Sequence, residues 1–168
     1  MAVQPLTSLP ASSAVFIDAN IFIYAFNRSS HQCEEFVLRC ARQEIAGIVS
    51  FEVIHEATHQ FMMIEAVAKR VIQKPSVHAL NANPAGVAGL SDYWKNTRAI
   101  LDLGVLLAPC SEAILDRAQS VRASTGLLTN DSLIVATMQD YGVVNVATND
   151  KSFARVAGIS QYAPQDIP

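Results

Sequence analysis

Residues 14–26 read AVFIDANIFIYAF, and this stretch contains the transition that decides the fold. Residues 14–18 run through four apolar positions to Asp18, which predicts a short buried strand that ends at the carboxylate. Residues 19–26 follow directly and predict a helix. A strand without polar alternation is typical of a parallel sheet that is covered on both faces. The stretch therefore predicts the first βα unit of an α/β fold.

The same alternation of short apolar strands and longer helices continues along the chain. Further strands are expected at residues 45–50, 104–109 and 143–148, and near 159–162. Further helices are expected at residues 30–44, 51–72, 91–102, 111–124 and 129–141. Ser50 and Ser111 are natural N-caps for two of these helices. Strands that alternate with helices indicate βαβ units, so we expect a three-layer α/β/α domain with a central parallel β-sheet.

The length of 168 residues predicts a single domain over residues 1–168. Residues 1–13 are expected to form an N-terminal tail. Residues 73–90 are rich in Pro, Gly, Asn and Ala, so about 66–97 is expected to hold a longer connection or a helical insertion.

Charged residues are few in this chain. They make up 16% of it, whereas an average globular protein has roughly 25%. We therefore expect part of the surface to be covered by another subunit, as in a homodimer. The net charge of −3 provides no global basic field, so any contact with nucleic acid must rest on a local patch.

The sequence also predicts a cellular setting. The cysteines at positions 33, 40 and 110 form no C-x-x-C motif and leave one over, which favours a reducing, cytoplasmic environment. Residues 1–13 lack the features of a signal peptide. No apolar run is long enough to span a membrane, so we expect a cytoplasmic protein with no membrane partner.

Four acidic residues fall at positions that should meet. Asp18 ends the first strand, Asp150 stands just past the strand 143–148, Asp131 lies in the first turn of a helix, and Glu56 lies two turns into another. Ligand sites form at the carboxyl edge of parallel strands, so we expect the four carboxylates in one small space. Taken individually, Asp150 would fit a turn position, Asp131 would fit a helix N-terminus through the helix dipole, and Glu56 would fit a solvated helix surface.

Asp18 is the hardest of the four to explain by structure alone, because a carboxylate between apolar neighbours is costly without a partner. Crowded carboxylates also hold protons unless a cation offsets their charge. Mg²⁺ and Mn²⁺ prefer oxygen ligands of this kind. The pattern therefore predicts a site for one or two divalent cations.

Four segments resemble, in chain order, the acidic motifs of PIN-domain nucleases. They are FIDANIFIYAF (16–26), VSFEVIHEATHQF (49–61), NDSLIVATM (130–138) and VATNDKSFARV (146–156). The resemblance runs from about residue 14 to 160, with a longer segment than expected at 66–97. The matching positions are Asp18 with Asn20, Ser50 with Glu56, Asp131, and Thr148 with Asp150.

The resemblance implies a metal-dependent ribonuclease that hydrolyses phosphodiester bonds of RNA with Mg²⁺ or Mn²⁺. It implies that Asp18 and Asp131 are the principal metal ligands, that Glu56 and Asp150 complete the coordination, and that Asn20, Ser50 and Thr148 orient these groups. Arg28, Lys151 and Arg155 are near enough in sequence to contact phosphates, although surface solvation explains each equally well. Many small members of the family resemble VapC toxins, which implies a homodimer and an antitoxin partner.

The stretch His55-Glu56-Ala57-Thr58-His59 fits the zinc-protease pattern H-E-x-x-H. A third zinc ligand is missing at the expected distance after His59, so we assign Glu56 to the acid cluster instead. The sequence leaves two more classes of protein open. One is a phosphoacceptor receiver-like module, which has a similar sheet edge, and the second is a PIN-like binding protein without catalysis.

Overall fold

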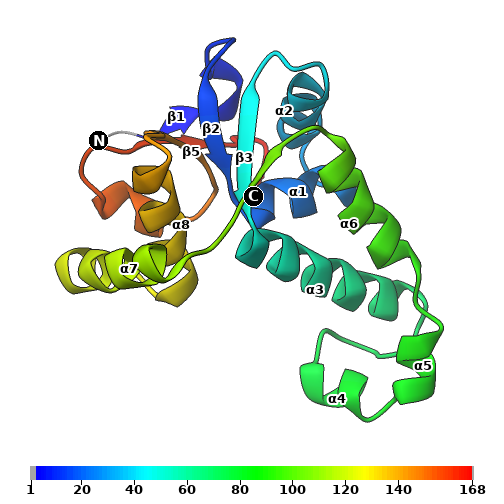
Figure 1. Cartoon of the computed structure of the whole chain (residues 1–168). Coiled ribbons are helices and arrows are strands. Elements are labelled where there is room, and N and C mark those ends of the chain that lie inside the picture. The colour runs from blue at the N-terminus through cyan, green and yellow to red at the C-terminus, as the bar shows by residue number, and fades with distance from the viewer. Residues whose placement is uncertain (1–2, 168) are drawn as a thin grey trace.

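The computed structural model describes residues 3–167, and its centre is a parallel sheet with the strand order β1-β6-β5-β2-β3-β4 (Figure 1). The strands are β1 (Gln4–Pro5), β2 (Ala14–Ile17), β3 (Ala46–Ser50), β4 (Leu106–Ala108), β5 (Asn145–Ala147) and β6 (Ser160–Ala163). β2 is an inner strand of this sheet. The next strands along the chain, β3 and β4, lie on one side of β2, and the later strands, β5 and β6, lie on the other. Asp18 follows β2 and therefore lies in the middle of the carboxyl edge.

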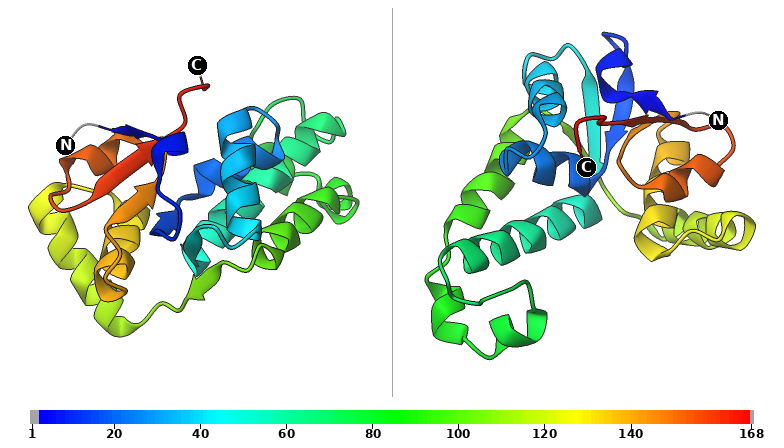
Figure 2. Two further views of the ribbon diagram at one scale, coloured as in Figure 1. Left: turned by 90° about the horizontal axis from the view of Figure 1, so that it is seen from above. Right: turned by 180° about the vertical axis from the view of Figure 1, so that it is seen from behind.

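Helices cover both sides of this sheet (Figures 1 and 2). One side carries α1 (Ala19–Phe26), α2 (His31–Ala41), α3 (Phe51–Ala68) and α6 (Asp92–Asp102). The other side carries α7 (Glu112–Thr125) and α8 (Thr129–Asp140). Short helices complete the chain: η1 (Leu6–Ser8), α4 (Val77–Asn81), α5 (Pro84–Ala88) and η2 (Lys151–Arg155). The predicted three-layer α/β/α architecture is confirmed.

The core explains why β2 contains no polar residue. Val15, Phe16 and Ile17 are all fully buried, and Phe16 pairs with Ile48 of β3 on one side and Val146 of β5 on the other. Side chains on both faces of a central strand are covered by helices, so both faces must be apolar. The register also aligns the ends of β2 and β3, which brings Asp18 near Ser50.

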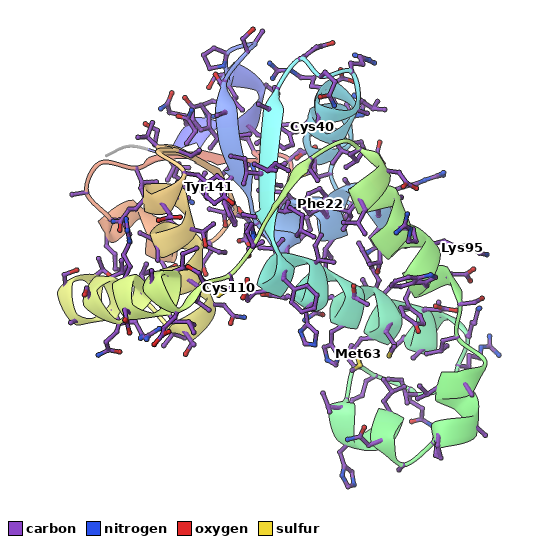
Figure 3. The ribbon with its side chains drawn as sticks, in the orientation of Figure 1. Phe22, Cys40, Met63, Lys95, Cys110 and Tyr141 are labelled. Carbon is purple, nitrogen blue, oxygen red and sulfur yellow. The ribbon has the colours of Figure 1, made fainter. Side chains whose placement is uncertain are left out.

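Cysteines contribute to this core. Cys33 and Cys40 are buried in the main core, whereas Cys110 is exposed; Cys40 of α2 and Cys110 are labelled in Figure 3. Burial raises the pKa of the Cys33 thiol to about 11 and that of Cys40 to about 12. Both therefore stay protonated and pack as small apolar groups.

Residues 66–97, expected as a connection or insertion, form the end of α3, helices α4 and α5, and the start of α6. They build a separate small apolar cluster that includes Met63, Ala66, Ile72 and Leu80, and Met63 lies on the side of α3 that faces α4 (Figure 3). The insertion is thus a helical extension with a small core of its own.

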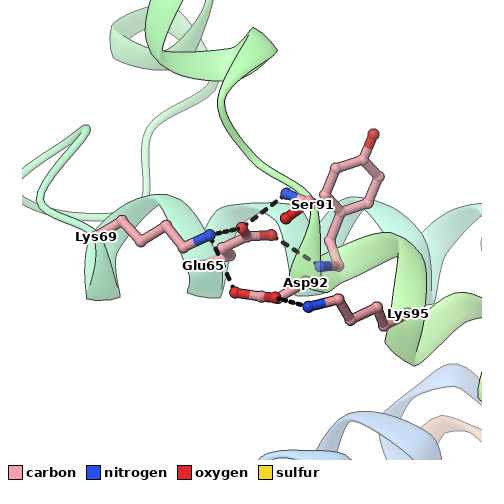
Figure 4. A network of polar contacts seen from close by, with 6 residues as sticks. Glu65, Lys69, Ser91, Asp92 and Lys95 are labelled. Atoms are coloured by element: carbon pink, nitrogen blue, oxygen red, sulfur yellow. Dashed lines mark hydrogen bonds and ion pairs between the residues drawn. The ribbon is translucent and has the colours of Figure 1, made fainter.

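Glu65 anchors this extension to α6 (Figure 4). Its side chain is 6% exposed, and it accepts hydrogen bonds from Lys69 Nζ at 2.6 Å and from the N–H groups of Ser91 at 2.8 Å and Tyr93 at 2.7 Å. Burial would raise the pKa of Glu65, but these hydrogen bonds outweigh it and lower the pKa to about 2. Asp92 closes the network by pairing with Lys69 at 3.0 Å.

The N-terminal segment, predicted as a tail, packs on the domain over its described part, residues 3–13. Gln4 pairs with Tyr162 of β6, and Leu6 and Leu9 are buried. A two-residue strand is too short to leave a periodic pattern, so only the apolar Leu6 and Leu9 could have indicated it. In the described part of the chain, no helix has the length and apolar character needed to cross a membrane.

Candidate active site

Asp18 is the centre of a buried hydrogen-bond network. It is the N-cap of α1, and its Oδ1 accepts the N–H of Ala19 at 2.7 Å. Its Oδ2 accepts the hydroxyl of Thr148 at 2.6 Å and the amide of Asn20. The side chain is only 8% exposed, so the carboxylate is fixed in orientation by three donors.

Thr148 and Asn20 also connect Asp18 to the loop after β5. The Asn20 amide reaches Thr148 Oγ1 at 3.1 Å, and Asn20 Oδ1 accepts the N–H of Asn149 at 3.2 Å. Thr148 Oγ1 accepts the N–H of Asp150 at 3.0 Å. The two ends of the PIN-like pattern, 128 residues apart in sequence, are therefore held together.

Asp150 and Asp131 lie on either side of Ser152. Asp150 is the N-cap of η2 and accepts the N–H of Ser152 at 2.7 Å. The hydroxyl of Ser152 lies 3.4 Å from Asp131 Oδ2, in the first turn of α8. Ser152 is not among the residues predicted from the sequence, and only its position two residues after the Thr-x-Asp segment could have indicated it.

Glu56 reaches the same place from α3. Its Oε2 lies 3.5 Å from the side-chain amide nitrogen of Asn130, the residue before Asp131. Sequence analysis also missed Asn130, although its adjacency to Asp131 is a usable signal. The structure thus brings Asp18, Glu56, Asp131 and Asp150 to one region at the carboxyl edge of the sheet.

The charges in this region affect one another. Burial raises the pKa of Asp18 to about 6; the hydrogen bonds from Thr148 and Ala19 oppose this rise, and the charges of Glu56 and Asp131 add to it. The pKa of Asp18 therefore reports both a desolvated carboxylate and acidic neighbours.

The pKa of Asp131 is also raised. Burial is the largest cause, followed by the charge of Asp150, and Glu56 adds to the rise. The hydroxyl of Ser152 and the positive charge of Arg155 act in the opposite direction. Arg155 is thus close enough to Asp131 to affect its ionisation.

Ser50 stands at the N-cap position of α3, as predicted, but its side chain makes no capping hydrogen bond. Its hydroxyl is buried at the carboxyl end of β3 and has no hydrogen-bond partner among the described residues. A buried hydroxyl without a partner is costly, so this oxygen is a free donor or acceptor near the acid cluster.

The three predicted phosphate contacts are placed differently. Arg155 lies near Asp131, and Lys151 is exposed at the start of η2, next to Asp150. Arg28 is exposed beyond the far end of α1, about 12 Å along the helix axis from the end that carries Asp18, from the rise of about 1.5 Å per residue. Arg28 instead lines a hollow with Phe26 and Leu38.

The acid cluster suits a hard divalent cation by its chemistry, because it offers carboxylate oxygens, one of them on a desolvated side chain with a raised pKa. In residues 3–167, no three His, Cys, Asp or Glu side chains are close enough together to form a ready-made metal site. Asp18, Asp150 and Asp131 each have a protein hydrogen-bond partner, as carboxylates that bind metals commonly do.

The H-E-x-x-H stretch does not form a zinc site. His55 is exposed and His59 is half-buried on α3, and neither takes part in a cluster of three ligand side chains within the described residues. Glu56 is turned toward Asn130 instead.

Comparison with known proteins agrees with this geometry. The family model described as PIN domain matches residues 15–159, which includes all four acids. The chain belongs to the PIN domain family. This membership excludes two of the classes that the sequence left open, the receiver-like module and the zinc protease, because both belong to other families.

Solved structures share the fold. A chain of a toxin–antitoxin complex from Klebsiella pneumoniae is 20% identical, with a TM-score of 0.54 over 88% of this chain and 95% of that chain. A chain of VapBC2 from Rickettsia felis, bound to a DNA fragment from its promoter, is 14% identical, with a TM-score of 0.56 over 89% and 98%. PAE2754 from Pyrobaculum aerophilum is 15% identical, with a TM-score of 0.50 over 88% and 90%. No curated protein matches the chain.

Proposed function

We propose that this PIN domain is a Mg²⁺- or Mn²⁺-dependent endoribonuclease that hydrolyses phosphodiester bonds of RNA at the four-carboxylate region. The observation that carries this proposal is the state of Asp18. Burial and two acidic neighbours make the charged form of Asp18 costly, even though three hydrogen-bond donors stabilise it. A bound cation would offset that cost.

Asp18 and Asp131 would be the principal ligands of the ion, and Glu56 and Asp150 would complete its coordination directly or through water. When bound, the ion supplies an activated water and neutralises charge on the scissile phosphate and the leaving oxygen. The buried hydroxyl of Ser50 has no protein partner within residues 3–167, and it would hydrogen-bond an ordered water next to the cluster.

The surrounding residues would keep these carboxylates in position. Thr148 and Asn20 fix the Asp18 carboxylate through its Oδ2. Ser152 donates its N–H to Asp150 and its hydroxyl to Asp131, and so connects the two carboxylates. Partners of this kind set ligand orientation, and their loss typically costs about 10–100-fold in metal affinity or activity.

Arg155 and Lys151 would contact phosphates of the RNA backbone. Arg155 already lies within electrostatic range of Asp131, and Lys151 is exposed beside Asp150. Phosphate contacts position a nucleic acid without specifying its sequence. Arg28 would act away from the cluster, at the far end of α1.

We also propose that the protein is the toxin of a toxin–antitoxin pair, that it forms a homodimer and that it works in the cytoplasm. Two of the structural neighbours are toxin–antitoxin complexes. The scarcity of charge, 16% of the chain, supports a surface that is partly covered by protein. Several large apolar side chains agree with this, since Leu106, Leu115, Leu128 and Val144 are each at least half exposed.

Cleavage of a labelled RNA tests the proposed function. Wild-type protein with Mg²⁺ or Mn²⁺ should produce discrete fragments, and EDTA should abolish them. Asp131→Asn should lose cleavage, whereas Asp102→Asn, an exposed acid paired with Arg98 at the surface, should retain it. Metal-independent cleavage, or equal rates in the two variants, would contradict the assignment; complete absence of cleavage by the wild type would favour a PIN-like binding protein.

A further inference from the structure

A hollow of about 290 Å³ lies between α3 and α6, which run side by side (Figure 1). Two exposed aromatic residues line it: Phe51, the first residue of α3, is 63% exposed, and Trp94 of α6 is 54% exposed. His55 also lines it, because it stands one helical turn after Phe51 on the same face of α3. The hollow therefore presents aromatic rings to solvent.

The interior of the hollow offers almost no unsatisfied polar group. Thr58 and Thr97 line it, but their hydroxyls lie 2.9 Å apart. Each hydroxyl also lies within hydrogen-bond distance of a carbonyl of its own helix, Thr58 of Ile54 at 2.7 Å and Thr97 of Tyr93 at 2.9 Å, so each proton has an acceptor within the protein. The surface left for a ligand is apolar and aromatic, so it suits a flat, weakly hydrated ring.

A second hollow connects this surface to the acid cluster. It measures about 300 Å³ and is lined by Phe51, Glu52, His55 and Asn130. Phe51 and His55 thus belong to both hollows, and Asn130 lies 3.5 Å from Glu56. None of the four acids lines either hollow, so Asn130 is the link through which a strand bound at Glu56 would reach the ring of Phe51 and then Trp94.

We propose that these two hollows bind a nucleobase of single-stranded RNA, one that neighbours the phosphate at the acid cluster, with Phe51 and Trp94 contacting its ring. This inference rests on the proposed ribonuclease function and adds to it a contact for one base of the substrate at Phe51 and Trp94. Proteins recognise RNA sequence mainly on splayed-out single-stranded bases that stack on aromatic side chains. A base within a duplex would have to be unpaired and unstacked to reach Trp94, at a cost of about a few kcal/mol.

The observations favour a base over a protein segment. The volumes of the two hollows, about 290 and 300 Å³, lie at the lower end of the range for small-ligand sites. Continuity with Glu56 also points to the substrate. A protein partner on this face is the competing outcome that the experiment must separate.

The experiment compares Phe51→Ala and Trp94→Ala with wild type on two single-stranded RNAs. One is intact, and the second lacks the base beside the cleaved bond. With intact RNA, KM should rise by about five- to a hundredfold in each variant, the range expected for loss of one base-stacking contact. With the abasic RNA, wild type should itself show the raised KM, and the variants should add nothing to it.

Tyr141→Ala is the matched control, because Tyr141 (Figure 3) is an exposed aromatic residue at the C-terminal end of α8, whereas Asp131 lies in the first turn of this helix. It should leave both KM values unchanged. Phe51 and Trp94 are more than half exposed, so their truncation should not unfold the protein, which circular dichroism verifies. Unchanged KM in both variants, or a penalty that persists on abasic RNA, overturns the inference.

Two further outcomes distinguish a base site from a protein interface. Loss of self-association in Phe51→Ala, measured by light scattering, with unchanged affinity for RNA overturns the inference and makes the face a protein interface. If wild type cleaves no RNA, the proposed function fails. Fluorescence anisotropy of labelled single-stranded RNA in EDTA then tests separately whether the hollow binds a base. Tighter binding by wild type than by Trp94→Ala supports the base site, and equal binding overturns it.

Discussion

Replacement of Asp18 by Asn should stabilise the metal-free protein at neutral pH. The pKa of Asp18 is about 6 in the fold, against 3.8 for an unperturbed Asp. A difference of about two units corresponds to about 3 kcal/mol, at about 1.4 kcal/mol per unit. The Asn amide is neutral, but its NH₂ group is a donor where the Asp18 oxygen accepts from Thr148 and Asn20. The loss of these hydrogen bonds offsets part of the gain. We therefore expect Asp18→Asn to raise the free energy of unfolding by about 1–3 kcal/mol.

The sign of the pH dependence follows from the same values. Because the folded-state pKa of Asp18 is raised, the folded protein binds more protons than the unfolded chain between about pH 4 and pH 6. The cost of the Asp18 charge is absent below about pH 4, grows as the pH rises and is complete above about pH 6. The advantage of Asp18→Asn over wild type should grow over this interval.

Urea unfolding in EDTA at several pH values measures this difference, and Asp102→Asn provides an exposed control that should follow wild type. Excess Mg²⁺ should then stabilise wild type more than Asp18→Asn, because the variant lacks a ligand. Cleavage by Asp18→Asn should fall by at least about a hundredfold, the upper end of the effect of removing a group that only supports a ligand. Parallel stability curves for wild type and Asp18→Asn would refute the argument for a buried, unfavourable charge.

Three further changes test the surrounding structure. Thr148→Val should reduce cleavage by about 10–100-fold and raise the pKa of Asp18 further, whereas Thr148→Ser should restore both; equal rates in the two variants would contradict the positioning role. Glu65→Gln should lower the free energy of unfolding by about 1–3 kcal/mol through loss of charge-assisted hydrogen bonds, measured by urea unfolding at neutral pH beside Glu34→Gln as a surface control. The stability from Glu65 should persist from neutral pH down to about pH 4.5 and disappear toward about pH 2, because its pKa is lowered. Light scattering at micromolar concentration should give a mass of at least two chains, and a mass near 18.2 kDa would contradict the dimer.

The acid cluster was predictable because it depends on strand ends. Asp18 and Thr148 stand at the ends of apolar strands, and parallel strands end at one edge, so the sequence alone brings them together. The same logic placed Glu56 and Asp131, which follow helix starts near that edge. Each acid alone has an ordinary structural explanation, and only the four motifs in chain order indicated the PIN-domain family.

Further features depend on contacts that no local pattern records. Ser152 and Asn130 act through hydrogen bonds to residues 21 and 74 positions away. Ser50 occupies the predicted cap position, yet its hydroxyl has no partner among the described residues. The position of Arg28 depends on the direction in which α1 leaves the sheet, and proximity to Asp18 in sequence therefore overestimated its proximity in space.

The most direct test of the central claim is the position of Mn²⁺ in a crystal of the wild-type protein, located by anomalous X-ray scattering. The account predicts a peak bound by the carboxylate oxygens of Asp18 and Asp131, with Glu56 and Asp150 bound directly or through water. A peak held by His55 and His59, or one remote from all four acids, would contradict it.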